Sequence, residues 1–273
     1  MEAKAVSVAT SHSQSVLATL GDDLFRSGAG PHTGPRRSTT VFIIASPRPA
    51  TGKTFLARLL AEFLHMNGGL VEAFELSPGD VALSDVLPEF TTPSDIDTTQ
   101  AQMRLFDRLI LADGVAKVVD VGHESFQRFF SLIDEIGFAR EAHRRGLDVI
   151  VLYAADAHPV SIKAFSILQR RLTDLIIAPV FNDGLLKGRR LRDQYPVSQA
   201  AAVPLQIPIL PPTLKSHVER SRHSFADFHQ QLTSPIPIGP DFELRSWTKR
   251  AFLEFREFEL RLLMGKLQDS LKG

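Results

Sequence analysis

The sequence predicts an α/β protein with a mostly parallel sheet and helices on both faces. Short apolar runs rich in β-branched residues alternate along the chain with longer segments whose apolar side chains recur at helical spacing. This alternation is typical of βαβ units, in which helices cover both faces of a parallel sheet. In addition, a Gly-Lys-Thr loop at residues 52–54 joins the first strand to the first helix. Such loops lie at the carboxyl ends of parallel strands, where ligands bind.

Each element follows from its local pattern. Strands are expected at the apolar runs, residues 41–45, 70–76, 116–122, 148–154, 174–181 and 203–210. Helices are expected at the segments with helical spacing, residues 54–65, 100–111, 125–145, 160–172, 185–194, 212–232 and 241–268. Residues 81–97 are polar and contain prolines, which predicts a loop with short helical pieces.

Composition and charge exclude several classes of function. The 273 residues are 44% hydrophobic, which suits one large domain or two small ones with a sizeable core. The 31 basic and 31 acidic residues cancel, so no global field draws the chain to nucleic acid. The absence of cysteine excludes disulfides, thiolate zinc sites and cysteine nucleophiles. Because no apolar run approaches membrane-spanning length and the N-terminus lacks a signal-peptide core, we expect a cytoplasmic protein.

The Gly-Lys-Thr loop predicts a nucleotide-phosphate site. A helix N-terminus presents unpaired backbone N–H groups and the positive end of its dipole. Lys53 is expected to reach the β- and γ-phosphates, and the Thr54 hydroxyl to bind Mg²⁺. The usual pattern, G-x-x-x-x-G-K-[ST], has glycine where this chain has Pro47. The alternative is a loop that contains Gly-Lys by chance. The residues expected to hold the nucleotide phosphates are Ala50, Thr51, Gly52, Lys53, Thr54 and Phe55.

Composition divides the chain after residue 38. Residues 1–38 are rich in Ser, Ala and Gly and end in a Gly- and Pro-rich stretch, which predicts a flexible tail. Residues 39–273 form the predicted nucleotide-binding domain, including the C-terminal helices. A helix within the tail would pack either on the main domain or on a partner protein, and the sequence leaves both open. The tail residues with helical spacing are Val16, Leu17, Leu20, Leu24 and Phe25.

Asp120 is a candidate metal ligand. It lies at the end of the apolar run 116–122, where a carboxylate can hold Mg²⁺ directly or through water. Gly122, just after it, would let the backbone approach a γ-phosphate. The alternative is that Asp120 caps the following helix, a role that Ser125 would fill equally well. Because a phosphate loop is already present, we favour the Mg²⁺ role.

Asn182 is a candidate contact for the base. It follows the strand expected at residues 174–181, and its amide can both donate to and accept from a nucleobase edge. The alternative is that Asn-Asp-Gly at residues 182–184 is simply a turn. The Pro-rich loop at residues 208–212 is expected at the same end of the sheet, where it would form one wall of the base pocket.

The histidines and the late basic residues give weaker signals. The nine histidines lack metal-ligand spacing, so no zinc site is expected. We interpret His123, beside the proposed γ-phosphate loop, as a surface or capping residue. The late basic residues either share a DNA-binding face or are ordinary solvated helix surface. These residues are Lys187, Arg189, Arg190, Arg192, Lys215, Arg220, Arg222, Arg245, Lys249 and Arg250.

The order of these features resembles the ParA/MinD family of deviant Walker-A ATPases, which are P-loop NTPases. The similarity covers about residues 39–265, from the first strand to the last helix. In that family the loop reads K-G-G-x-G-K-[ST], and its first lysine reaches the partner's phosphates in a nucleotide-sandwich dimer. Here Arg48 takes that lysine's position, and Pro49 and Ala50 replace the two glycines.

The family's second motif, D-x-D-P-Q, aligns with residues 75–79 of this chain. Its first Asp is therefore Glu75, and its second Asp is Ser77. In the family, the second Asp helps to position the attacking water. Asp80 is close enough in the sequence to substitute for it. The resemblance thus implies ATP binding, with hydrolysis that is slow, altered or absent.

The resemblance implies a protein that dimerises on ATP and positions a cargo, such as a plasmid or a large protein assembly. Its catalytic residues would be Lys53, Arg48 and Asp80, and its cofactors ATP and Mg²⁺, with the metal held by Thr54 and Asp120. The family further implies nonspecific DNA binding by the dimer and an activating partner protein.

Two alternatives to this function stay open. The first is a nucleotide-gated interaction protein without useful turnover, serving in conjugation, secretion or polar localisation, and the change to Ser77 favours it. The second is a small-molecule ligase or kinase similar to dethiobiotin synthetase. That enzyme class needs a substrate-pocket motif, which the sequence does not show.

Overall fold

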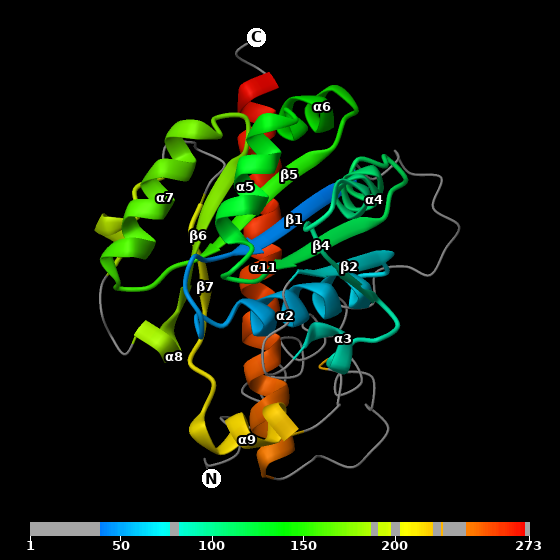
Figure 1. Ribbon diagram of the computed structural model, residues 1–273. Coiled ribbons are helices and arrows are strands. Elements are labelled where there is room, and N and C mark those ends of the chain that lie inside the picture. Colours follow the sequence, from blue (N-terminus) through cyan, green and yellow to red (C-terminus); the bar gives the residue numbers. More distant parts are fainter. Residues whose placement is uncertain are drawn as a thin grey trace, which may run out of the picture. The chain divides into compact units, whose positions relative to one another are not determined.

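A seven-stranded sheet organises the chain, and all of its strand pairs are parallel (Figure 1). This confirms the predicted α/β class. The computed structural model describes residues 39–76, 82–186, 191–197, 203–220, 225 and 239–270. The strands are β1 Thr40–Ala45, β2 Val71–Leu76, β3 Thr91–Ser94, β4 Ala116–Val121, β5 Asp148–Ala154, β6 Ile176–Asn182 and β7 Leu205–Ile207.

Strand β1 lies at the centre of the sheet, and its position decides where a ligand would bind. The strand order is β3-β2-β4-β1-β5-β6-β7, so the chain builds one side of the sheet before it crosses β1 to the other. Residues Val41 to Ala45 are all buried, as expected of an apolar strand covered on both faces. The loop after β1 therefore lies between the ends of β4 and β5, at the topological switch point where α/β sheets bind ligands.

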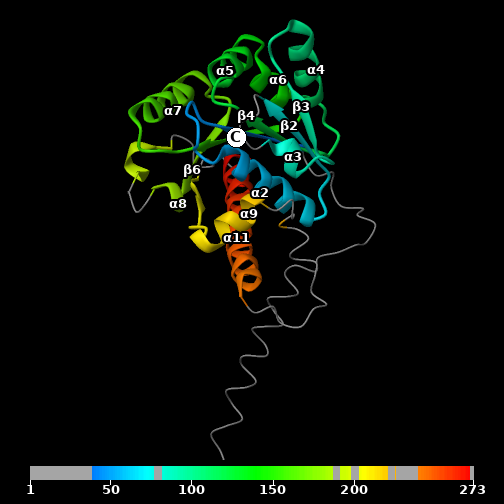
Figure 2. The ribbon, with the colours of Figure 1, turned by 60° about the horizontal axis from the view of Figure 1, so that its bottom comes forward.

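Helices cover both faces of the sheet and enclose two separate apolar cores (Figures 1 and 2). Side chains alternate along a strand, so Val41 and Ile43 face one core whereas Phe42 and Ile44 face the other. The first core is covered by α4 Thr99–Leu109, α5 Phe126–Glu135, α6 Phe138–Arg144 and α7 Pro159–Arg171. The second core is covered by α2 Lys53–Met66, α3 Leu83–Val86, α9 Pro212–Arg220 and α11 Pro240–Ser270.

Local sequence explains where several helices begin and end. Thr98 caps α4, because its side chain accepts a hydrogen bond of 3.1 Å from the backbone N–H of Ala101. Helix α7 has Pro159 in its first turn, where the missing N–H costs nothing. The long helix α11 buries Trp247 completely, and the Trp247 indole N–H donates to the carbonyl of Pro208 at 3.1 Å. This contact fixes the loop that follows β7.

Two expectations for the middle of the chain are wrong. The helix expected at residues 125–145 is two helices, α5 and α6, because Gly137 adopts a left-handed φ of 62° between them. The segment 81–97, expected to be a loop with helical pieces, contains α3 and also strand β3. Strand β3 includes Pro93 and lies at the sheet edge, the position where a sheet tolerates proline.

Several expected boundaries also shift. The expected strand 203–210 is the shorter β7. Of the expected helix 185–194, the described residues form the end of α8 Asp183–Leu186 and a 3₁₀ turn, Arg192–Gln194, whereas residues 187–190 lie outside the described part. The expected helix 212–232 is described only as α9. The predicted tail, residues 1–38, lies outside the described residues. Within the described part of the chain, no helix is long and apolar enough to cross a membrane.

Candidate functional site

The loop between β1 and α2 turns the chain sharply into the helix. Gly52 is the residue before α2 and has a left-handed φ of 78°, which turns the chain into the helix. The carbonyl of Gly52 accepts the first helical hydrogen bond, 2.9 Å from the N–H of Leu56. Ala50 has a φ of 55°, a conformation that a Cβ atom makes unfavourable. Two loop residues therefore adopt the left-handed conformation that favours glycine, and one of them, Ala50, is not a glycine.

Ala50→Gly is expected to raise the free energy of unfolding by up to about 1 kcal/mol. The gain from removing the Cβ in the left-handed region, about 1–2 kcal/mol, is partly offset by the greater freedom of glycine in the unfolded chain. Ala164→Gly, in the middle of α7, is the matched control and should lower stability by about 1 kcal/mol. Urea unfolding of both variants measures the difference, and equal losses in both would contradict the strain at Ala50.

Lys53 lies inside the loop, with its ammonium group buried. Its Nζ donates to the carbonyl of Arg48 at 2.8 Å and to the hydroxyl of Thr51 at 3.4 Å. Burial lowers the pKa of Lys53, while the negative charges of Asp120 and Asp156 raise it. The loop thus encloses a cation that its own backbone carbonyl partly solvates.

Arg48 is tied to the neighbouring strand end. Its Nη1 lies 3.1 Å from Oδ2 of Asp156, which follows β5. The other carboxylate oxygen of Asp156 accepts from the N–H of His158 at 2.7 Å. The buried Tyr195 holds the backbone of Asp156, since the Tyr195 hydroxyl donates to its carbonyl at 2.6 Å. Arg48 is therefore held over the loop by an acid that is itself fixed on two sides.

Asp120 presents a buried carboxylate to the N-terminus of α2. Strand pairing places it beside Ile44 and Glu75, on the face of the sheet that α2 covers. Burial raises the pKa of Asp120 to about 6; hydrogen bonding to Thr54 and the charge of Lys53 act to lower it, and Glu75 adds to the rise. Its Oδ1 is buried and has no hydrogen-bond partner. An orphaned carboxylate oxygen beside a threonine hydroxyl fits a hard divalent cation such as Mg²⁺.

Glu75, the residue at the first Asp position of the second motif, holds α3 in place. One carboxylate oxygen accepts from the N–H of Leu83, and the other accepts from the Ser84 hydroxyl at 2.7 Å. Ser77 and Asp80, which the sequence linked to water positioning, lie outside the described residues. The structure thus gives Glu75 a local structural role and leaves the catalytic expectation for Asp80 as a prediction.

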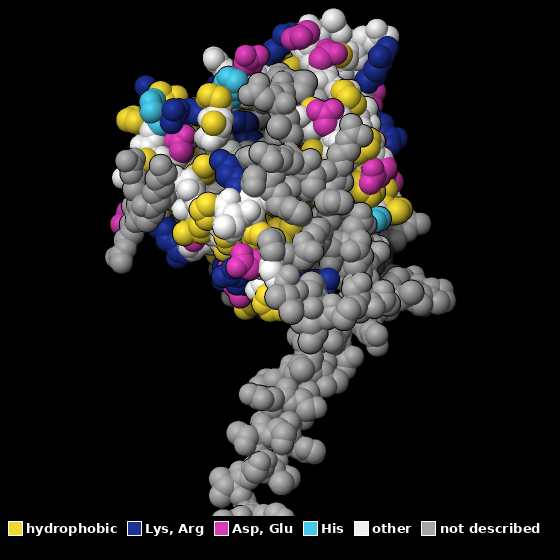
Figure 3. Space-filling view, turned by 90° about the horizontal axis from the view of Figure 1, so that it is seen from below, with side chains coloured by type: hydrophobic (Ala, Val, Ile, Leu, Met, Phe, Trp, Pro, Cys, Tyr) yellow, Lys and Arg dark blue, Asp and Glu magenta, His cyan; other side chains and the backbone are white. Residues whose placement is uncertain are grey.

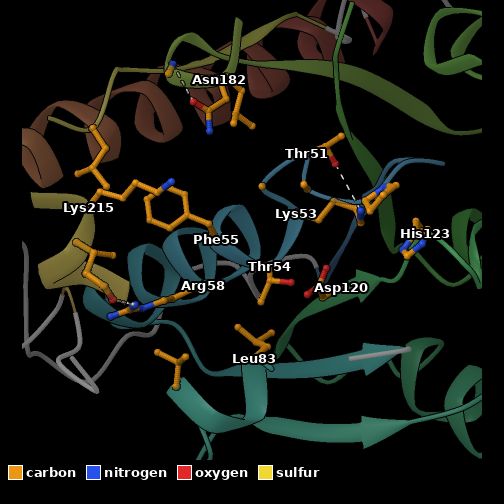
Figure 4. Close-up of a pocket in the computed structure, with 18 of the residues that line it drawn as sticks. Thr51, Lys53, Thr54, Phe55, Arg58, Leu83, Asp120, His123, Asn182 and Lys215 are labelled. Carbon is orange, nitrogen blue, oxygen red and sulfur yellow. Dashed lines mark hydrogen bonds between the residues drawn. The ribbon is translucent and has the colours of Figure 1, made fainter. Parts of the chain in front are cut away.

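A cavity of about 770 Å³ joins these groups (Figure 4). Of the residues predicted to form the site, Ala50, Thr51, Gly52, Lys53, Thr54, Phe55, Asp120 and Asn182 all line it. Arg48 is not among the lining residues, although its carbonyl holds Lys53. The rest of the wall comes from Pro49, Arg58, Leu83, Val86, Gly122, His123, Gly184, Leu185, Pro208, Leu210, Lys215 and Val218.

Asn182 makes the expected turn and also lines the cavity. Its Oδ1 accepts a hydrogen bond of 3.0 Å from the N–H of Gly184, which is the expected turn. The side chain also lines the cavity, with Nδ2 so close to Gly52 that a Cβ there would lie 3.5 Å away. The amide donor of Asn182 is therefore placed beside the loop, together with the wall formed by Pro208 and Leu210.

The structure describes only some of the late basic residues. Lys187, Arg189, Arg190 and Arg222 lie outside the described residues, and Lys215 lines the cavity. On the face in Figure 3, the described Lys and Arg side chains are mixed with acidic and apolar ones. DNA binding therefore stays a prediction.

Sequence reasoning missed Asp156, which pairs with Arg48. The signal that could have found it is an acid just after the carboxyl end of a strand. Glu75 was aligned with the second motif, but its hydrogen bonds to α3 were not expected. His123, interpreted as a surface or capping residue, is exposed but also lines the cavity.

No protein-family model matches the chain, and a search of curated proteins finds no match.

In the described part of the chain, no group of three or more His, Asp or Glu side chains is arranged to hold a metal ion. A cation at this site would therefore take its protein ligands from Asp120 and Thr54 and the rest from phosphate or water.

Proposed function

We propose that this chain is a ParA-like, P-loop protein that binds ATP with Mg²⁺, dimerises on the nucleotide and positions a cargo such as a plasmid or a large assembly. The observation that carries the proposal is the pairing of two features across adjacent strands. The loop after β1 encloses the buried Lys53 at a helix N-terminus, and β4 presents the orphaned oxygen of Asp120 beside Thr54. The first feature suits phosphate, and the second suits its metal.

The phosphates would lie over residues 50–55. The backbone N–H groups at the start of α2 would bind them. The ammonium of Lys53 would donate to the phosphates instead of to the carbonyl of Arg48. Asn182 would contact the base, between the β6 end and the wall formed by Pro208 and Leu210. The cavity volume of about 770 Å³ is within the range of small-molecule sites.

Asp120 and Thr54 would hold Mg²⁺, which neutralises charge on the β- and γ-phosphates. A cation there would also compensate the carboxylate of Asp120, whose pKa is raised because it is buried. Arg48 would leave Asp156 and reach the phosphates of a partner chain, as the resemblance implies. In the structure, Nη1 of Arg48 lies 3.1 Å from Oδ2 of Asp156.

ATP turnover and molecular mass of the purified full-length chain, followed with and without nonspecific DNA, test this function. Turnover together with ATP-dependent dimerisation supports the positioning ATPase. The absence of both ATP binding and dimerisation would refute it, and would show that Pro49 and Ala50 have disabled the loop.

The alternative function is a nucleotide-gated interaction protein without useful turnover. One observation favours it: among the described residues, Asp120 is the sole carboxylate that lines the cavity. With Asp120 assigned to the metal, no further described acid lines the cavity to position an attacking water. ATP-dependent dimerisation without hydrolysis is the result that this alternative predicts.

Asp156→Asn is expected to tighten ATP binding. The carboxylate of Asp156 lies close enough to act on Lys53, so it also repels phosphate bound in the loop. A partly screened unit charge several ångströms away contributes about 0.7–1.4 kcal/mol, which corresponds to roughly 3- to 10-fold in Kd. Titration with a fluorescent ATP analogue measures the change. Asp134→Asn, at an exposed ion pair on α5, is the control, and weaker binding by Asp156→Asn alone would contradict the expectation.

A further inference from the structure

His123 occupies the end of the cavity where Asp120 lies. It follows β4 directly after Gly122, and both residues line the cavity. The carbonyl of His123 accepts from the N–H of Phe126 at 3.4 Å, which fixes its backbone at the start of α5. Figure 4 shows the imidazole on the side of Lys53 and Asp120, across the cavity from Phe55 and Lys215.

The charged side chains that line the cavity are bound elsewhere, assigned to the metal or distant from this end. Lys53 is bound by its own loop, and Asp120 is the expected metal ligand. Arg58 pairs with Glu62 at 3.0 Å within α2, with both side chains buried. Lys215 lies on α9, on the opposite side of the cavity. At the Asp120 end of the cavity, His123 is thus an exposed side chain that can hold a water by hydrogen bonding.

We propose that His123 is a catalytic residue that orients the attacking water in ATP hydrolysis, in place of the second acid that this chain lacks at Ser77. This inference rests on the proposed nucleotide site. The imidazole would accept a hydrogen bond from the water whose oxygen forms the new bond to the γ-phosphorus. The bond from that phosphorus to the β–γ bridging oxygen breaks, and ADP leaves with its electron pair. One water proton stays on the phosphate, and the other passes through the imidazole to solvent.

Single-turnover and steady-state hydrolysis by His123→Ala and His123→Gln test the role. A group that acts on the water changes kcat and leaves ATP binding unchanged. We expect kcat to fall about 100-fold in His123→Ala, within the range for a positioned acid–base group, with the Kd for ATP within about twofold of the wild type. Glutamine keeps a hydrogen-bonding group, so His123→Gln should recover at least several-fold of the loss. His143→Ala, at an exposed position on α6 outside the cavity, is the control and should keep wild-type kcat.

The outcomes separate this inference from the proposed function. Two results would overturn the role of His123 and leave the nucleotide site standing. One is an unchanged kcat in His123→Ala, and the other is an increase in the Kd for ATP that accounts for all of the lost activity. A wild-type chain that binds ATP but does not hydrolyse it also overturns this role, and supports the gated interaction protein. A wild-type chain that does not bind ATP refutes the proposed function itself.

Discussion

Lys53→Met is expected to weaken ATP binding about 10- to 100-fold and to remove turnover. Methionine keeps the length of the side chain but loses the charge that Lys53 brings to the centre of the loop. A hydrogen bond to a charged group contributes about 1.5–3 kcal/mol, which corresponds to that loss in affinity. Because burial lowers the pKa of Lys53, the folded chain holds this charge at a cost, so the variant should not be less stable.

The control for this prediction is a second lysine variant, with ATP affinity and stability measured on the same samples. Lys163→Met changes an exposed lysine on α7, outside the cavity, and should leave ATP affinity unchanged. Calorimetric titration gives the affinity, and thermal unfolding shows that the variant is folded. Wild-type affinity in a folded Lys53→Met protein would place the phosphate elsewhere than in the loop after β1.

Asp120→Asn is expected to stabilise the ligand-free chain at neutral pH while removing Mg²⁺-dependent turnover. The folded pKa of Asp120 is about 6, above its ordinary value of 3.8. For an acid with a raised folded pKa, the stabilising contribution is complete below the unfolded pKa and is lost as pH rises through the folded pKa. Between about pH 4 and 6 the wild type therefore loses stability that the asparagine variant keeps, on the order of 3 kcal/mol by pH 7.

Urea unfolding of wild type and Asp120→Asn from pH 3.5 to 8 measures this difference. The two curves should meet at low pH, separate from about pH 4 and stay a constant distance apart above about pH 6, with the variant more stable. Asp113→Asn is the matched control of opposite sign. Burial raises the pKa of Asp113, but hydrogen bonds from Lys117 and the backbone outweigh it and lower the pKa, so this variant should be less stable at neutral pH. A destabilised Asp120→Asn protein at pH 7 would show that the ionised carboxylate is satisfied in the fold.

Sequence patterns predicted the fold well where burial alone decides the structure. The runs at β1 and β5 are apolar and β-branched because helices cover both faces, so their positions were readable directly. The patterns failed where a single residue or the sheet edge decides. Gly137 breaks an apolar period that continues through α5 and α6, and β3 carries Pro93, which usually argues against a strand.

The candidate site shows the same division. Lys53, Thr54 and Asp120 were predictable because each has a fixed place relative to a strand end, and all three line one cavity. Asp156 was not, because its role depends on pairing with Arg48, 108 residues earlier in the sequence. His123 was interpreted as a surface or capping residue, because a sequence cannot show whether an exposed side chain lies on the outer surface or in the wall of a cavity.

Equilibrium binding of ATP to the purified chain, measured by calorimetry with and without Mg²⁺, decides whether this cavity is a nucleotide site. The arrangement of Lys53, Thr54 and Asp120 predicts saturable binding of a single nucleotide per chain, strengthened by Mg²⁺ and weakened in Lys53→Met. The Mg²⁺ dependence should vanish in Asp120→Asn. Absence of saturable binding to the folded wild-type chain, in the presence of Mg²⁺, would contradict the assignment of this cavity to a nucleotide.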